Sequence, residues 1–176
     1  MDHIDPQTLV FLDETSTPTT MTPLRARAPR GTRILGWVPR GRWASVTLLA
    51  TLTPSGFGPG LQIEGALDRQ SFDTFVARTL LPTLRPGTTV VLDNLSVHKS
   101  ATARTLIETA GCHLVFLPTY SPDFNPIEPA LSKLKQLLRR AEARSLDAVM
   151  TATSDVYSRI TAADAHAYYR AAGYFL

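Results

Sequence analysis

The sequence predicts a single α/β domain built on one mixed sheet. Three observations carry this prediction. In the first third of the 176 residues, apolar and β-branched runs alternate with turn-forming residues, which is typical of antiparallel strands. The middle third alternates helical apolar periodicity with short β-branched runs, which indicates parallel strands joined by a helix. The last third carries only helical patterns, and these helices are expected to pack on the sheet.

The expected strands are short, and two of them end in an aspartate. Apolar runs place strands at residues 8–13, 32–38, 43–53, 61–63, 88–93 and 113–117. Residues 16–33 are rich in Thr, Pro and Arg, which predicts a loop or an irregular excursion. The early strands would form an antiparallel meander that the later, parallel strands extend.

Helices are expected where apolar residues recur at a spacing of three to four. The pattern predicts them at residues 70–81, 100–110, 126–141, 146–160 and 162–172. Ser100 is a candidate N-cap and Gly111 a candidate C-terminal stop for the second helix. The third helix has the clearest apolar stripe, formed by Ile127, Leu131, Leu134, Leu138 and Ala141.

Composition excludes several classes of protein. Hydrophobic residues make up 44% of the chain, which is enough for a core and excludes global disorder. No apolar run approaches the roughly 18 residues of a membrane helix. The first six residues lack the basic and apolar regions of a secretory signal. Cys112 is the only cysteine, so neither an intramolecular disulfide nor a cysteine-based zinc site is expected. A cytoplasmic location is therefore expected.

Basic residues gather in two stretches, although the net charge is only +3. No acidic residue lies between Thr15 and Ile63, and the second stretch coincides with the third predicted helix. Arginine matches phosphate geometry, so clustered arginines favour nucleic acid as a partner. A solvated basic face explains the pattern equally well. The first cluster is Arg25, Arg27, Arg30, Arg33, Arg40 and Arg42, and the second is Lys133, Lys135, Arg139, Arg140 and Arg144.

Three acids are candidates for a metal site. Asp13 and Asp93 each end an apolar strand, so parallel neighbouring strands would place them side by side at the carboxyl edge of the sheet. Glu128 starts the third helix, after 34 intervening residues that allow the chain to return to this edge. Oxygen ligands without Cys or His favour Mg²⁺ or Mn²⁺. Three carboxylates around two such ions are suited to in-line phosphoryl transfer.

Each acid also has an ordinary structural explanation. Asp13 and Asp93 could start turns, as aspartate often does. Glu128 could complete a capping arrangement with Asn125, with Pro126 in the first turn. Other acids compete for the catalytic role: Asp68 and Asp73 flank a helix start, and Asp123 lies in a turn-rich loop.

Three segments surround the candidate acids: Phe11-Leu12-Asp13-Glu14-Thr15, Leu92-Asp93-Asn94-Leu95-Ser96-Val97-His98-Lys99, and the twelve residues from Leu117 to Glu128. These motifs resemble the DDE transposases of the mariner superfamily, in particular its bacterial insertion-sequence branch. The likeness spans residues 8 to 175, and the 34-residue interval matches the spacing in that group. The resemblance implies a ribonuclease H-like fold, two Mg²⁺ ions that Mn²⁺ could replace, cut-and-paste DNA transposition, and Asp13, Asp93 and Glu128 as the metal-binding triad.

The resemblance also implies DNA contacts outside the triad. Lys135 lies seven residues after Glu128, two helical turns along the same face. It resembles a DNA-contacting residue of many DDE enzymes, although a solvated lysine explains it as well. His98 could orient a water, contact phosphate, or be a loop histidine without a catalytic role. Lys99 and Arg139 complete the expected DNA contacts. Ala130-Leu131 stands where many relatives carry an aromatic residue.

The resemblance covers the catalytic region alone. Full-length relatives carry helix-turn-helix modules before the first aspartate, whereas 12 residues precede Asp13 here. We therefore expect residues 1–176 to be one catalytic domain that works in the bacterial nucleoid. Its expected partners are DNA, a helix-turn-helix product of an upstream reading frame, and a second copy on DNA, with no membrane. The alternatives are a structure-selective nuclease, a non-catalytic remnant or regulator of the transposase, and a phospho-acceptor receiver domain.

Overall fold

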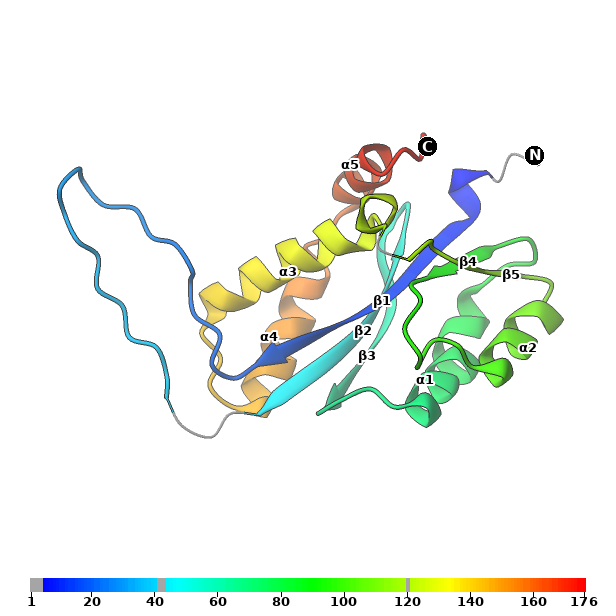
Figure 1. Ribbon diagram of the computed structural model, residues 1–176, viewed down its shortest axis with the longest axis horizontal. Helices are drawn as coiled ribbons and strands as arrows, with labels where there is room; N and C mark the ends of the chain where they lie inside the picture. Colours follow the sequence, from blue (N-terminus) through cyan, green and yellow to red (C-terminus); the bar gives the residue numbers. More distant parts are fainter. Residues whose placement is uncertain (1–4, 41–43, 120) are drawn as a thin grey trace.

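A five-stranded sheet in the order β3-β2-β1-β4-β5 forms the centre of the molecule (Figure 1). The computed structural model describes residues 5–40, 44–119 and 121–176. β1 pairs antiparallel with β2 and parallel with β4, and the outer pairs continue these two directions, so the predicted mixed sheet is confirmed. The strands are β1 (Leu9–Pro18), β2 (Ser45–Thr53), β3 (Gly56–Glu64), β4 (Thr89–Leu92) and β5 (His113–Phe116).

Helices cover both faces of this sheet (Figure 1). On one face of the sheet, a hydrophobic core joins β1 and β2 to the last three helices. On the other face, a second hydrophobic core joins the strands to the first two helices. The first face carries α3 (Ile127–Ala141), α4 (Leu146–Tyr157) and α5 (Ala162–Ala171), and the second carries α1 (Arg69–Phe75), its π-helical continuation (Val76–Leu80) and α2 (Ala101–Thr109).

The alternation of side chains along β1 decides which residues face which helices. Phe11 belongs to the core under α3 and α5, whereas Leu12 belongs to the core under α1 and α2. Because successive strand residues point to opposite faces, Asp13 faces the α3 side. Glu14 faces the α1 side. Asp13 and Glu14 therefore lie on opposite faces of the sheet, although they are adjacent in the sequence.

Residues from opposite ends of the chain meet at the start of β1. The hydroxyl of Tyr169, on α5, lies 2.9 Å from the carbonyl oxygen of Leu9 and 3.1 Å from that of Leu52. The Tyr169 ring is fully buried and packs edge-on against Phe11 at a centroid distance of 5.3 Å. These contacts fix α5 and the β1–β2 pair to each other.

Three sequence-based expectations about these elements are wrong. β1 continues past Asp13 to Pro18, because β2 pairs with it as far as the Pro18–Ser45 pair. Residues 32–38 form no strand and are exposed in the connection between β1 and β2. The helix expected at 70–81 changes from α-helical to π-helical at Val76.

The connection between β1 and β2, residues 19–44, is called the excursion below, and its described residues 19–40 project from the body of the molecule (Figure 1). Its two ends are joined, because the Thr19 amide donates to the Ala44 carbonyl at 2.9 Å. Arg144, after α3, donates to the Met21 carbonyl at 2.6 Å and fixes the base of the excursion. Farther out the side chains are exposed, including Trp37 at 96%.

Among the described residues, no helix has the length and apolar character needed to cross a membrane.

Candidate active site

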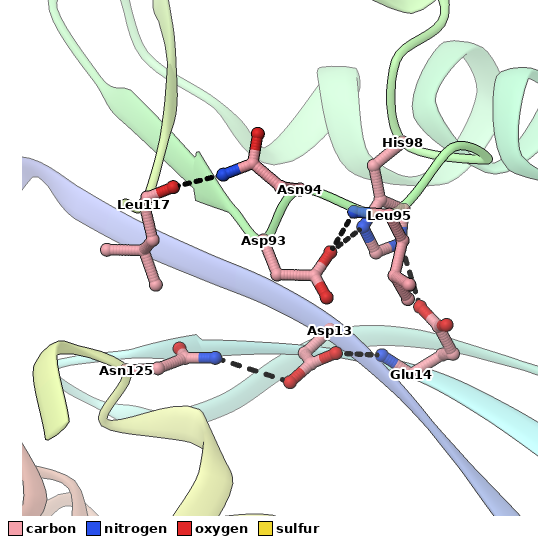
Figure 2. Close-up of polar contacts among 8 residues, drawn as sticks. All are labelled: Asp13, Glu14, Asp93, Asn94, Leu95, His98, Leu117 and Asn125. Atoms are coloured by element: carbon pink, nitrogen blue, oxygen red, sulfur yellow. Dashed lines mark hydrogen bonds and ion pairs between the residues drawn. The ribbon is translucent and has the colours of Figure 1, made fainter. Parts of the chain in front are cut away.

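Asp13 and Asp93 occupy equivalent positions on neighbouring parallel strands. The last parallel pair between β1 and β4 is Leu12 with Leu92, and each aspartate is the next residue. The sheet therefore places both acids at one edge, beyond the carboxyl end of β4 (Figure 2). Asp13 is not at a strand end, because β1 continues along β2, so a turn does not explain it.

Asp13 is a buried carboxylate with two hydrogen bonds. Its Oδ1 accepts from the Glu14 amide at 2.8 Å and its Oδ2 accepts from Asn125 Nδ2 at 3.3 Å (Figure 2). Its side chain is 6% exposed. Burial, followed by the negative charge of Glu128, raises the pKa of Asp13 from 3.8 to about 7, against the lowering effect of the Glu14 hydrogen bond. A cation at this site would relieve the strain of ionising Asp13.

Asp93 is more open and is stabilised in its charged form. Its Oδ1 accepts from the Leu95 amide at 3.0 Å and lies 2.6 Å from His98 Nδ1. Burial would raise the pKa of Asp93, but these hydrogen bonds and the positive charges of His98 and Lys99 lower it below its ordinary value. The neighbouring Asn94 amide donates to the Leu117 carbonyl and ties this loop to the end of β5 (Figure 2).

Glu128 lies in the first turn of α3 and is exposed. It lines a pocket of about 410 Å³ together with Asp93, Asn94 and Asn125. The alternative in which Asn125 caps α3 is wrong, because the Asn125 side chain donates to Asp13 and no side chain caps this helix. Helix α3 thus directs Glu128 toward the same edge of the sheet as the two aspartates.

The donor set fits a hard divalent cation. All three side chains offer carboxylate oxygens, and burial, followed by the negative charge of Glu128, raises the pKa of Asp13. Within the described ranges, no three acidic, His or Cys side chains gather into a ready-made ion cage. Mg²⁺ does not need one, because it commonly binds one or two carboxylates and completes its shell with water and substrate phosphate.

The rival acids serve other purposes or lie elsewhere. Asp68 caps α1 by accepting from the Ser71 amide at 2.7 Å. Asp73 lies within α1, on the far side of the sheet from α3. Asp123 is exposed in the short 3-10 turn before α3 and does not line the pocket.

His98 is fully buried, so its expected contact with DNA phosphate is wrong. Its ring nitrogens face two carboxylates, with Nδ1 2.6 Å from Asp93 and Nε2 2.8 Å from Glu14 Oε2 (Figure 2). Burial would lower the pKa of His98, but the two neighbouring carboxylates, Asp93 first and then Glu14, raise it from 6.5 to about 9. The ring is therefore an imidazolium at neutral pH. Lys99, in contrast, is exposed.

The basic residues lie along α3 and the excursion. Lys135 and Arg139 are half-buried on α3. A groove of about 390 Å³ between the excursion and α3 brings Arg25 from the first basic cluster beside Arg139 and Arg140 from the second. The other described arginines of the excursion, Arg27, Arg30, Arg33 and Arg40, are exposed, and Arg42 lies outside the described residues.

Sequence reasoning missed two residues of this site. Glu14 follows Asp13 directly in the sequence. Because side chains alternate along β1, Glu14 lies on the opposite face of the sheet from Asp13, where it contacts His98. Asn125 was considered as a helix cap, whereas it donates to Asp13. The signal that could have identified Glu14 is its position as an acid in the middle of a long strand, and this requires knowing that β1 extends to Pro18.

Comparison with known proteins assigns this chain to a family. The model of the DDE superfamily endonuclease matches residues 8–150. The chain belongs to the DDE superfamily of endonucleases. The matched range contains the whole sheet and all three candidate acids of this DDE domain.

Relatives of the DDE domain are transposases. It is 27% identical over 120 residues to the transposable element Tc1 transposase of Caenorhabditis elegans, which covers 66% of this chain and 44% of that protein. The Mos1 transposase paired-end complex with the left transposon end has a TM-score of 0.71 at 17% identity, covering 94% of this chain and 51% of that one. The Mos1 mariner catalytic domain has a TM-score of 0.61 at 14% identity, covering 95% and 76%.

These likenesses confirm the expected ribonuclease H-like fold. The sequence of the chain is also similar to that of the Tc1 transposase. The chain spans less than half of the Tc1 transposase and about half of the Mos1 chain bound to its transposon end.

Proposed function

We propose that this chain is the catalytic domain of a DNA transposase that cleaves DNA strands at the ends of an insertion sequence and joins them to target DNA. One observation carries the proposal: within a DDE superfamily domain, the Asp13 carboxylate is buried beside Asp93 and the charge of Glu128, and its pKa is raised to about 7. Paired acids whose ionisation is unfavourable without a cation are characteristic of metal-dependent phosphoryl transfer sites.

Asp13, Asp93 and Glu128 would hold two Mg²⁺ ions, with Mn²⁺ as a substitute. Mos1 complexes with Mg and with Mn support this choice of metal. When bound, such ions activate the attacking hydroxyl and stabilise the leaving oxygen of an in-line displacement. The chain's own residues keep the carboxylates in place: Asn125 and the Glu14 amide orient Asp13, and the Leu95 amide orients Asp93. No covalent enzyme intermediate is needed.

The proposal is tested by removal of the metal. Purified protein incubated with a plasmid that carries the element's ends should nick it in the presence of Mg²⁺ or Mn²⁺. The same reaction in EDTA should give no nicks, and added Mn²⁺ should restore them. The assay is repeated with a helix-turn-helix partner, supplied in trans or by fusion. Nicking that persists in EDTA would contradict a metal-dependent mechanism.

A second candidate is a DNA-binding regulator without catalysis. The arginine groove between the excursion and α3 favours it, because this groove offers DNA contacts that do not involve the carboxylates. In that case both the free chain and the fused chain would bind DNA, and neither would cleave it with any metal. The nicking assay therefore separates the two candidates.

The DNA would run from the carboxylate pocket along α3 to the arginine groove. Glu128 and Arg139 are eleven residues apart on α3, which corresponds to about 16 Å, or roughly five base pairs. Ser132, one turn after Glu128, and Gln136 line the groove with Arg25 and Arg139. The pocket and the groove thus lie along one helix. We propose that this line of side chains holds the phosphate backbone.

We expect the isolated chain to bind duplex DNA weakly, with strong salt dependence and little sequence preference. Phosphate contacts position DNA without reading its sequence. Replacing both Arg25 and Arg139 with alanine should lower the slope of log K against log salt by about 0.9 for each lost contact. The measurement is a binding titration at several salt concentrations on element-end and scrambled duplexes.

The matched control for this titration is Arg78→Ala, an exposed arginine on the opposite face of the sheet. It should leave the slope unchanged, and an equal loss would show that binding is not localised to the groove. A helix-turn-helix partner should add preference for the element's ends. Strong discrimination by the chain alone would contradict the proposed upstream partner.

Two further features belong to the proposal. The exposed apolar side chains of the excursion, Leu35 at 80% and Trp37 at 96%, favour a second copy of this chain as a partner on DNA, since exposed apolar surface marks interaction sites. A protein with this role would work at the nucleoid of a bacterial cell.

A further inference from the structure

His98 links two carboxylates that lie on different strands. Its Nδ1 is 2.6 Å from Asp93 Oδ1 and its Nε2 is 2.8 Å from Glu14 Oε2 (Figure 2). The contact with Glu14 is a close charge pair rather than a well-aligned hydrogen bond. The ring is fully buried and packs against Phe72 of α1 at a centroid distance of 5.0 Å. Neither ring nitrogen is left to contact solvent or DNA.

Local chain geometry builds this link. Glu14 lies two residues after Leu12 on the α1-facing side of β1, so it reaches toward the loop that follows β4. In that loop the His98 amide donates to the Leu95 carbonyl at 3.1 Å, and this turn brings the imidazole back to Asp93. Phe72 closes the other side of the ring. The imidazole is thus held by β1, by its own loop and by α1.

The link distinguishes the two oxygens of Asp93. Oδ1 receives the Leu95 amide at 3.0 Å and the His98 ring at 2.6 Å. Among the described residues, no side chain or amide donates to Oδ2, while the Asp93 side chain keeps 34% of its surface exposed and lines the pocket. His98 therefore fixes the rotation of this carboxylate and leaves one oxygen free toward the pocket.

We propose that His98 and Glu14 are positioning residues that orient Asp93 Oδ2 for binding a divalent cation. This role rests on the proposed function, in which Asp93 is a metal ligand. Glu14 acts through His98: it holds the ring in the orientation that directs Nδ1 at Asp93. Partners of this kind commonly change metal affinity 10- to 100-fold when they are lost, because the ligand is no longer held in position.

Two substitutions of His98 separate its two contacts. In His98→Asn the side-chain amide nitrogen takes the place of Nδ1, so the donor to Asp93 is kept and Glu14 is lost. In His98→Gln the amide nitrogen takes the place of Nε2, so Glu14 is kept and the donor to Asp93 is lost. The matched control is His166→Gln, an exposed histidine on α5. Glu14→Gln removes the charge of the outer carboxylate while keeping its size.

The measurement is Mn²⁺ binding to the DNA-free protein by electron paramagnetic resonance, with thermal unfolding recorded for every variant. His98→Gln should raise the apparent Kd for Mn²⁺ about 10- to 100-fold. His98→Asn, which keeps the donor to Asp93 but loses the contact with Glu14, should give a smaller rise in the apparent Kd than His98→Gln. Adding Glu14→Gln to His98→Gln should give little further loss, since residues acting through one another are not additive. In DNA cleavage, His98→Gln should need more Mn²⁺ for half-maximal rate and approach the wild-type rate at saturating metal.

Unchanged Mn²⁺ affinity in His98→Gln, with normal binding by the wild type, would overturn the positioning role alone. Equal losses in His98→Asn and His98→Gln would also overturn it, because a purely structural histidine predicts that result. If His98→Gln does not fold, the partly exposed Glu14→Gln tests the same link, and unchanged Mn²⁺ affinity there overturns the role of Glu14. Wild-type protein that binds no Mn²⁺ and cleaves no DNA would instead overturn the proposed function.

Discussion

Asp93→Asn should lower metal-dependent strand cleavage by about three orders of magnitude or more, which corresponds to about 4 kcal/mol of lost transition-state stabilisation. Asparagine keeps the shape of the side chain, and its oxygen can still accept from the Leu95 amide and His98. It loses the charge that would hold a cation. Asp93 is the carboxylate with the lowered pKa, so it would be ionised and ready for metal at neutral pH.

DNA affinity of the Asp93→Asn variant should stay within about threefold of wild type, because the proposed backbone contacts lie along α3 and the excursion. Cleavage of an element-end duplex and binding in EDTA are measured on the same preparation. Asp123→Asn is the matched control, since Asp123 is an exposed acid of the same motif that does not line the pocket. Cleavage at the wild-type rate by Asp93→Asn would mean that another acid carries the chemistry.

Asp13→Asn should make the metal-free protein more stable than wild type at pH 8, while abolishing cleavage. The pKa of Asp13 is about 7 in the fold and 3.8 as the ordinary value. A raised pKa means that the folded state holds the proton more tightly, so this group favours folding fully below pH 3.8. That contribution is lost as the pH rises through 7. A shift of about 3 units corresponds to on the order of 4 kcal/mol.

The experiment compares unfolding temperatures of wild type and Asp13→Asn in EDTA from pH 5 to pH 8. The difference should grow with pH in favour of the variant. The His98 contribution, lost as the pH rises from 6.5 through about 9, is common to both proteins and cancels in the comparison. Asp155→Asn, an exposed acid on α4, is the control and should follow wild type. Equal pH dependence in Asp13→Asn and wild type would show that Asp13 ionises without penalty.

Mg²⁺ should stabilise the wild type and not Asp13→Asn, which opposes the stability difference expected in EDTA. A ligand that binds only the folded state raises its stability in proportion to the logarithm of its concentration. At pH 8, added Mg²⁺ should therefore raise the unfolding temperature of wild type and leave Asp13→Asn nearly unchanged. This result would connect the raised pKa of Asp13 to cation binding rather than to burial alone.

Local sequence patterns were sufficient for most elements and for the position of the acids. The β-branched run before Asp93 and the apolar stripe of α3 are strong local signals, and both elements formed close to their expected bounds. The length of β1 could not be read locally. Thr15 to Pro18 resemble a loop in composition, and only pairing with Val46 and its neighbours on β2 makes them a strand.

The interior of the site depended on packing that no local pattern contains. Buried placement of His98 follows from Phe72 and Glu14, which lie far from it in sequence. Its neighbour Lys99 is exposed. The sequence of two adjacent basic residues in a loop does not indicate which of them is buried. The side chain of Asn125 likewise faces Asp13 because α3 packs across β1, which brings together residues 112 positions apart.

The closed base of the excursion has a consequence for the evolution of this domain. Thr19 and Ala44 are hydrogen-bonded directly beyond Pro18–Ser45, the last β1–β2 pair, so the chain leaves and re-enters the sheet at one point. Doubling the length of such a loop changes its closure free energy by only about 0.6 kcal/mol. The length of the excursion can therefore change at little cost in folding free energy. An insertion or deletion within it would leave the Asp13–Asp93 edge of the sheet intact.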